Sequence, residues 1–279
     1  MGVELIVLDF DGTLTDIDQE AGSAVNGWRA DIGNELGLSA SEIENKWSEA
    51  QAKIEAEPAK YGWLMGSRIV APAYADPLVM ARTISDLLFD EAGVYMARPE
   101  REDILQNKFF KSNYGKMGTV FKDGADDFLR GLCEKFDVCI VTNSGTSGVA
   151  KKVAQLPTDH SAIPILGDAK KYVLDLSWKD VPESVEREGY GRSLFLQRQK
   201  YGAVLSDLMA TRGLRPEQVT IIGDIYELDL LLPEYQRMNI VLTPRTSTPA
   251  FEVEAVRTSS RGYSANSLGE VLTHLESRR

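Results

Sequence analysis

Three aspartates stand directly after short apolar runs that are typical of buried strands. Asp9 and Asp11 follow the run from Val3 to Leu8, and Asp224 follows the run from Val219 to Gly223. If these carboxylates gather at one edge of a sheet, a pair about 4 Å apart repels by roughly 4 kcal/mol at an effective dielectric of about 20. A divalent cation relieves this repulsion, and a site made only of oxygen ligands suits magnesium. The sequence therefore predicts a Mg²⁺ site.

The same aspartates have the chemistry needed for phosphoryl transfer. A carboxylate that is ionised at neutral pH attacks a phosphate ester without help from a base, giving an aspartyl phosphate that water then cleaves. A second carboxyl group protonates the leaving alcohol and later takes a proton from water. The residues alone do not rank Asp9 above Asp11 as the nucleophile. An ordinary strand end with a tight turn at Asp11 and Gly12 is the alternative interpretation.

Small and polar residues at the predicted strand ends are candidates for binding a phosphate group. Gly12 lets the backbone turn sharply and leaves its amide near a phosphate. Thr142 offers a hydroxyl donor, although a β-branched residue at a strand end is also ordinary. Asn143 follows it directly. We therefore expect Gly12, Thr142 and Asn143 to bind the phosphate.

Short apolar runs alternate with helical patterns in most of the chain. The predicted strands cover residues 3–8, 137–142, 219–223 and 239–243, and the predicted helices cover residues 125–135 and 201–212. This alternation predicts an α/β fold with a parallel sheet that helices cover on both faces. In such sheets the ligand lies beyond the carboxyl ends of the strands, where the aspartates stand.

The stretch of residues 18–118 departs from this alternation and predicts a helical insertion. Ser39 to Glu42 form a capping box that opens a helix running to Pro58. Asp76 and Pro77 predict another helix start, and residues 99–113 carry a further helical pattern. No strand is expected here. The predicted organisation is a catalytic core of residues 1–17 and 119–279 with an inserted all-helical domain of residues 18–118.

The large and basic side chains of the insertion have ordinary structural interpretations. Four aromatic residues are expected in its core, not against a substrate: Trp28, Trp47, Tyr61 and Trp63. Three arginines could meet an anionic substrate but are expected on solvated helix faces: Arg29, Arg68 and Arg82.

Three separated motifs resemble those of the haloacid dehalogenase superfamily of phosphatases. Asp9-Phe10-Asp11-Gly12-Thr13-Leu14-Thr15-Asp16 is similar to its first motif, and Val141-Thr142-Asn143-Ser144 is similar to its second. Ile222-Gly223-Asp224, with Asp229 five residues later, is similar to its fourth. The order and spacing agree over residues 1–16 and 119–243.

The resemblance implies a Rossmann-like core with a helical cap inserted between the first two motifs. It implies Asp9 as the nucleophile and Asp11 as the acid and base. It also implies a Mg²⁺ ion held by Asp9, Asp224 and the Asp11 carbonyl group, with Asp229 as a metal or metal-water partner. The superfamily includes dehalogenases, which lack an acid two residues after the nucleophile because a halide leaves without a proton. Asp11 therefore favours phosphoryl chemistry.

The third motif of the superfamily departs from its usual form in this chain. A lysine, often followed by proline, is expected before the helix that precedes the fourth motif, but no such pair occurs. Arg198 follows the apolar run from Leu194 to Leu196 and is our first choice for this cation, with Lys200 second. Lys170 and Lys171 are a weaker alternative because they come well before this run.

Composition disfavours several classes of partner. The 31 basic and 42 acidic residues give a formal net charge of −11, which disfavours nucleic acids and anionic membranes. The N-terminus shows no signal-peptide pattern and the two cysteines form no metal motif. We therefore expect a cytoplasmic enzyme that hydrolyses a small phosphorylated metabolite. A phosphotransferase or mutase, and a catalytically silent binding protein on the same fold, are the alternatives.

Overall fold

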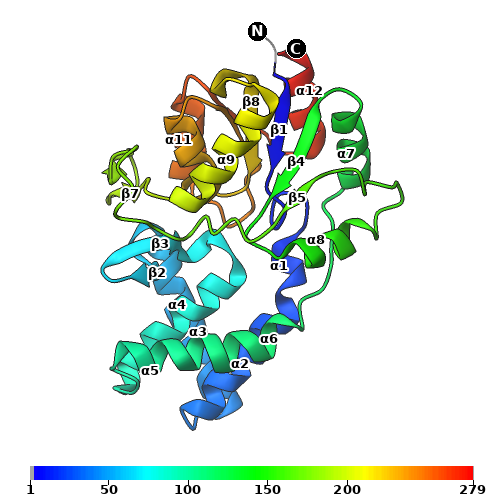
Figure 1. Ribbon diagram of the computed structural model, residues 1–279. Helices are drawn as coiled ribbons and strands as arrows, with labels where there is room; N and C mark the ends of the chain where they lie inside the picture. The colour runs from blue at the N-terminus through cyan, green and yellow to red at the C-terminus, as the bar shows by residue number, and fades with distance from the viewer. Residues whose placement is uncertain (1–2, 279) are drawn as a thin grey trace. The chain divides into compact units, whose positions relative to one another are not determined.

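The computed structural model describes residues 3–278 and divides into two compact units (Figure 1). The first unit contains the residues up to Asp16 and those from Phe121 onward, and the second contains Ile17–Val120. The expected boundaries at residues 17/18 and 118/119 differ from this division by one or two positions.

A parallel six-stranded sheet forms the centre of the first unit. Its order is β10-β9-β8-β1-β4-β5, and every neighbouring pair is parallel. The strands are β1 (Leu5–Leu8), β4 (Asp137–Val141), β5 (Ile165–Leu166), β8 (Val219–Gly223), β9 (Asn239–Leu242) and β10 (Gly262–Ser264). The four strands predicted from apolar runs are thus confirmed as β1, β4, β8 and β9.

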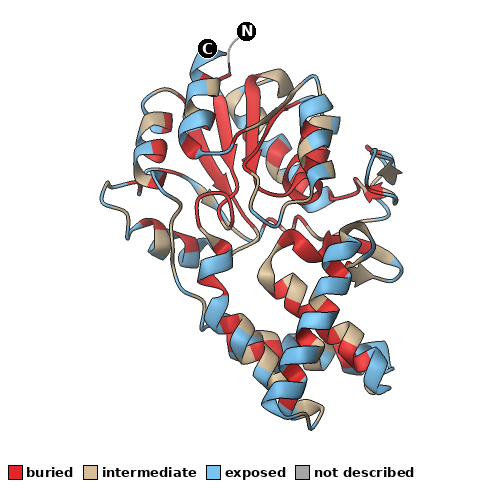
Figure 2. Cartoon of the chain, turned by 180° about the vertical axis from the view of Figure 1, so that it is seen from behind, coloured by how far each residue is buried: buried red, intermediate tan, exposed pale blue. Residues whose placement is uncertain are grey.

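Helices cover both faces of this sheet, as expected for a parallel sheet. They are α7 (Ala125–Cys133), α8 (Thr146–Val153), α9 (Gln199–Arg212), α10 (Leu231–Tyr235), α11 (Ala250–Thr258) and α12 (Leu268–Ser277). Leu5 and Val7 of β1 pack with residues of α9, α10 and α11, whereas Ile6 and Leu8 pack with α7, α8 and α12. Because β1 is buried on both faces, its sequence is continuously apolar (Figure 2).

The second unit is helical apart from one hairpin. Its helices are α1 (Ile17–Glu20), α2 (Gly22–Glu35), α3 (Ala40–Ala56), α4 (Pro77–Ala92), α5 (Arg98–Asp103) and α6 (Lys111–Tyr114). A π-helical stretch, Ile104–Phe110, joins α5 to α6. Short 3₁₀ turns cover Pro58–Lys60 and Ala73–Ala75. The first unit has a 3₁₀ turn at Pro216–Gln218 and a π-helical stretch at Tyr226–Leu230. The predicted helix starts at Ser39 and Asp76 are confirmed by their side-chain caps.

The prediction that the insertion is all-helical is wrong. Strands β2 (Gly62–Met65) and β3 (Arg68–Pro72) form an antiparallel hairpin. Gly66 adopts a φ of 65° in the two-residue turn, a conformation that glycine enters at little cost. The run Gly-Trp-Leu-Met was too short to be separated from a helix by periodicity.

The apolar run before Arg198 forms a short strand outside the central sheet. Leu194–Phe195 forms β7, which pairs antiparallel with β6 (Ser184–Val185) in a separate two-stranded sheet. It is not a strand of the central sheet. The apolar run packs against the core without joining the ladder, and an apolar pattern alone does not distinguish these cases.

The aromatic core of the second unit is largely as expected. Trp28 and Trp47 are buried in it, with Tyr61 packed at its edge. Arg82, however, is buried and not solvated: it pairs with Glu102 and lies 5.1 Å from the ring centre of Trp63.

The capping box at Ser39 allows a stability test of the second unit. The Ser39 hydroxyl accepts from the Glu42 amide, and the Glu42 carboxylate accepts from the Ser39 amide. We expect Ser39→Ala to lower the free energy of unfolding by about 1 kcal/mol, measured by urea unfolding with tryptophan fluorescence. Ser48→Ala, an exposed change inside the same helix, is the control and should cause no loss. An equal effect of both substitutions would contradict the capping role.

Candidate active site

Sheet register brings the first and fourth motifs together. Leu8 of β1 lies opposite Ile222 of β8, and the Asp9 amide donates to the Ile222 carbonyl group at 2.8 Å. The chain then continues past both strand ends to Asp9 and Asp224. Asp9, Asp224 and Asp229 each place a carboxylate oxygen within 4.8 Å of the other two. All three are buried.

Gly12 and Thr13 fit closely around this acidic cluster. Gly12 has a φ of 83°, and a Cβ atom there would lie 2.3 Å from Asp224 Oδ2. The Thr13 hydroxyl lies 3.3 Å from both Asp9 Oδ2 and Asp224 Oδ1. A side chain at position 12 would therefore displace Asp224, and glycine is needed there for space as well as for conformation.

The cation that contacts the cluster is Lys171. Its ammonium donates to Asp9 Oδ1 at 2.7 Å and to Asp229 Oδ1 at 2.9 Å, and its side chain is 1% exposed. The second oxygen of Asp229 accepts from the Ile225 amide at 3.1 Å. Asp229 is thus oriented by its own loop and in turn orients Lys171.

Polar side chains fix the main chain on both sides of Lys171. Asn143 Oδ1 accepts from the Lys171 amide at 2.8 Å, and the Arg198 guanidinium donates to the Lys171 carbonyl oxygen. Arg198 is fully buried and lies 3.4 Å from Glu227, which also pairs with Arg192. A buried ion network therefore supports the segment that carries the lysine.

The structure thus distributes the cations of the third motif differently from our ranking. Arg198 contacts the backbone of Lys171, whereas Lys200 is exposed on α9. Lys171, which we ranked lower, is the lysine against Asp9. The ranking relied on distance from Asp224 along the chain, but residues 167–198, between β5 and α9, contribute no strand to the central sheet.

Asp11 has a separate set of partners at the end of β4. The Ser144 hydroxyl donates to Asp11 Oδ2 at 2.6 Å, and the Thr142 hydroxyl lies 3.4 Å from the same oxygen. Lys152 Nζ lies 3.5 Å from Oδ1. Asp11 is about a quarter exposed by side chain, so Asp9 and Asp11 have distinct environments.

Two further cations near Asp224 were missed by the sequence analysis. Arg245 Nε lies 2.8 Å from Asp224 Oδ2, and Lys122 interacts electrostatically with Asp224 and Asp9. Neither belongs to a motif that we had singled out. Only the fold brings them to the carboxyl ends of the strands.

Burial sets the electrostatics of the acidic cluster. It raises the pKa of Asp9 well above the usual carboxyl value, although Lys171 opposes the shift. Burial also raises the pKa of Asp224 to about 6, against the attraction of Arg245. Burial acts to lower the pKa of Lys171, but Asp229 and Asp9 prevail and raise it. The cluster therefore favours added positive charge.

The residues present fit a divalent cation of the magnesium type. The donor set is all oxygen, and Asp224 Oδ2 is buried without a hydrogen bond from any described residue. Asp224 has the carboxylate oxygen best placed to hold the ion, since Asp9 and Asp229 both accept hydrogen bonds at each of their oxygens.

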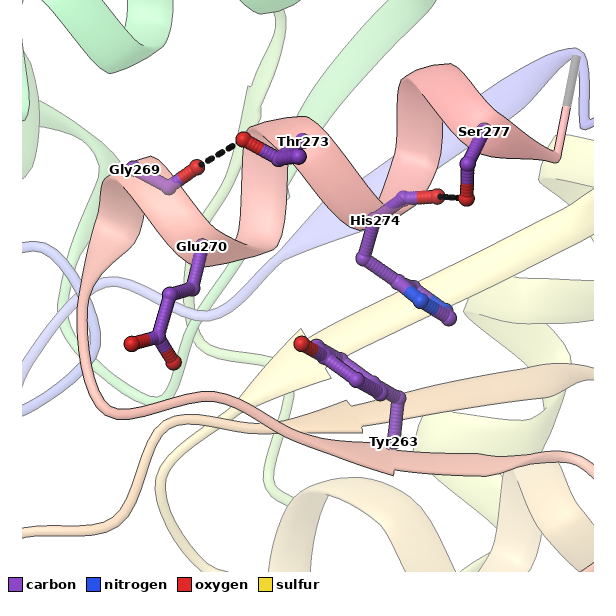
Figure 3. A pocket seen from close by; sticks show the side chains of 6 residues that line it. All are labelled: Tyr263, Gly269, Glu270, Thr273, His274 and Ser277. Carbon is purple, nitrogen blue, oxygen red and sulfur yellow. Dashed lines mark hydrogen bonds between the residues drawn. The ribbon is translucent and has the colours of Figure 1, made fainter.

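A shallow pocket elsewhere in the first unit lacks comparable chemistry. It is formed by β10 and α12 and lined by Tyr263, Gly269, Glu270, Thr273, His274 and Ser277. Figure 3 shows the Thr273 and Ser277 hydroxyls turned to carbonyl groups of their own helix and the Tyr263 ring facing His274. We therefore place the candidate site at the acidic cluster.

Three features together define the haloacid dehalogenase-like class of fold. They are a parallel sheet of this order, an insertion after its central strand, and these aspartates at its carboxyl edge. No protein-family model and no curated protein sequence matches the chain. Solved structures do match over almost the whole length. The chain therefore has the fold of the haloacid dehalogenase-like hydrolases.

Three of these structures show the extent of the likeness. A predicted phosphoglycolate phosphatase from Haemophilus somnus 129PT is 16% identical with a TM-score of 0.56, covering 98% of this chain and 97% of that one. A haloacid dehalogenase-like hydrolase from Xanthomonas campestris is 12% identical with a TM-score of 0.53, covering 99% and 96%. A haloacid dehalogenase-type hydrolase from Bacillus subtilis, bound to magnesium, is 12% identical with a TM-score of 0.51, covering 99% and 100%.

At these identities the likeness concerns the fold, and one fold hosts several reactions. The choice among reactions must come from the residues of the site. Among the described residues, no helix has the length and apolar character needed to cross a membrane.

The raised pKa of Asp224 predicts how pH affects stability without metal. Asp224 takes up a proton more readily when folded, with a pKa of about 6, than when unfolded, with a pKa of about 3.9. The contribution of Asp224 to the free energy of unfolding therefore falls as pH rises from about 4 to about 6, by roughly 3 kcal/mol in total. We expect the free energy of unfolding in EDTA to fall more steeply over this range for the wild type than for Asp224→Asn. Parallel pH profiles from urea titrations would contradict this prediction.

Proposed function

We propose that the protein is a magnesium-dependent phosphomonoester hydrolase that acts on a small phosphorylated metabolite through an aspartyl phosphate. The observation that carries the proposal is the pair of aspartates two positions apart with different partners. Asp9 is buried against a lysine and two further carboxylates, and Asp11 is part-exposed among hydroxyl groups. This arrangement suits one carboxylate as nucleophile and the other as proton carrier.

In the first step, an oxygen of Asp9 attacks the phosphorus atom and the bond to the alcohol oxygen breaks. Asp11 gives its proton to that leaving oxygen. In the second step, water attacks the phosphorus of the aspartyl phosphate while Asp11 takes its proton. The Asp9–phosphorus bond then breaks, releasing inorganic phosphate and the free carboxylate.

The remaining site residues hold charge and position. Lys171 offsets the negative charge beside Asp9, and Gly12, Thr142 and Asn143 are proposed to line the phosphate position. Asp9, Asp224 and the Asp11 carbonyl group would hold Mg²⁺, which when bound supplies positive charge to the phosphate and to the carboxylates. Asp229 supports this set through its bond to Lys171.

Local positive charge in an acidic protein supports a phosphate substrate. Four cations lie near these carboxylates: Lys122, Lys152, Lys171 and Arg245. They offset Asp9, Asp11, Asp224 and Asp229, so the site itself is far less negative than the whole chain. This is what binding of an anionic ligand requires.

A phosphotransferase or mutase uses the same aspartyl phosphate and differs only in its acceptor. Release of inorganic phosphate in water without an added acceptor favours the hydrolase.

We propose that the enzyme is cytoplasmic. We also propose that the inserted unit, residues 18–118 in the expected boundaries, acts as a cap that selects the substrate.

The first test of the proposal separates the roles of the two acids. With a panel of phosphorylated metabolites, we expect Asp9→Asn to abolish phosphate release and Asp11→Asn to reduce it by about 10²–10⁴-fold. Excess EDTA should stop the wild type, and added Mg²⁺ should restore it. Near-normal turnover by Asp9→Asn, or full activity in EDTA, is incompatible with the mechanism.

The second test compares neighbouring lysines with different surroundings. Lys171→Met removes the ammonium that contacts Asp9, so we expect kcat/KM to fall by about 10²-fold or more. Lys170→Met is the matched control, because Lys170 pairs with Asp168 at 3.0 Å and its side chain is 35% exposed. Circular dichroism in Mg²⁺ checks that both variants fold. Equal activity of the two folded variants would remove Lys171 from the mechanism.

A further inference from the structure

Arg245 stands on a loop that is hydrogen-bonded to the end of β8, the strand that precedes Asp224. The Thr243 amide, directly after β9, donates to the Gly223 carbonyl group of β8 at 2.9 Å. The Arg245 amide donates to the Thr248 hydroxyl at 2.9 Å, and the Thr248 amide donates back to the Arg245 carbonyl group at 3.0 Å. This turn holds the base of the arginine side chain beside Asp224.

The arginine side chain is directed at one oxygen of Asp224. The Arg245 side chain is 5% exposed, the Asp224 side chain is 1% exposed, and Nε lies 2.8 Å from Oδ2. The same oxygen accepts no hydrogen bond from any described residue. The contact is therefore an ion pair without the alignment of a hydrogen bond. The other oxygen, Oδ1, lies 3.3 Å from the Thr13 hydroxyl.

The two buried cations of the site hold their carboxylates in different ways. Lys171 donates aligned hydrogen bonds to Asp9 and Asp229. Arg245 Nε forms an ion pair with Asp224 Oδ2 but donates no aligned hydrogen bond to that oxygen. Charge-assisted hydrogen bonds are the stronger kind, so the contact of Arg245 Nε with Asp224 Oδ2 is weaker than the aligned contacts of Lys171.

We propose that Arg245 is an internal competitor of the divalent cation, occupying Asp224 Oδ2 in the metal-free protein and thereby setting the metal affinity of the site. The inference rests on the metal site of the proposed function and adds a residue that controls it. A metal ion on Asp224 would meet the positive guanidinium at close range, and like charges at such a distance repel strongly in a buried site. In the metal-free protein the same guanidinium stabilises the buried carboxylate.

Calorimetric titration of metal-free protein with Mg²⁺ tests the competition directly. We expect Arg245→Gln to bind Mg²⁺ at least about tenfold more tightly than the wild type, because the competing charge is gone. Arg245→Lys keeps the charge and should stay near the wild-type affinity. Arg257→Gln, on the exposed face of α11, changes the net charge equally and should have no effect.

Thermal unfolding supplies a readout that does not depend on heat of binding. In EDTA, Arg245→Gln should melt below the wild type because Asp224 has lost its counterion. In saturating Mg²⁺ this deficit should shrink or reverse, since tighter binding stabilises the folded state more. A variant that is merely damaged would stay below the wild type in both conditions, which would overturn the proposal.

The outcomes separate this inference from the proposed function. Metal binding by the wild type that Arg245→Gln leaves unchanged or weakens overturns the competition alone. If Arg245→Lys binds Mg²⁺ as tightly as Arg245→Gln, the charge of residue 245 is not the cause, and the competition is again overturned. Binding by Arg245→Gln but not by the wild type supports it. Absence of binding by both proteins overturns the metal site and the competition together.

Discussion

The site depends on one buried ammonium group that lies between two carboxylates. Lys171 contacts both Asp9 and Asp229, and all three side chains are at most 10% exposed. Without this cation, the acidic cluster would leave like charges in contact away from water, which proteins avoid by neutralising one of them. Lys171 therefore favours the charged form of Asp9 close to Asp224, where the register of β1 and β8 places it.

A long lysine side chain holds such a position only when its backbone is fixed. Asn143 binds the amide of Lys171, and Arg198 binds its carbonyl group. Arg198 itself depends on Glu227, whose other partner is Arg192. The positive charge beside Asp9 is thus supported by a second buried ion network behind it. Removing one member of a buried pair costs more than the pair contributes, so this support is coupled to the stability of the fold.

Local sequence patterns predicted those parts of the site that depend on strands of the central sheet. Asp9, Asp11 and Asp224 each follow a mainly apolar run, and a parallel sheet must bring such run ends to one edge. Lys171 and Arg245 stand on irregular segments, where no periodicity links position in the chain to position in space. The hairpin β2–β3 was missed for a related reason, because its strands are too short for alternation to be visible.

The contrast between the whole chain and its site favours recognition by direct contact. The net charge of −11 repels an approaching phosphate at long range, but salt screens this field beyond about 8 Å at physiological ionic strength. The cations beside Asp9 and Asp224 are buried or partly buried, so their attraction is screened much less. A small phosphate ester can bring its single charged group to these cations. The expectation that nucleic acids are disfavoured partners has the same basis, because their many phosphates would meet a chain of net charge −11.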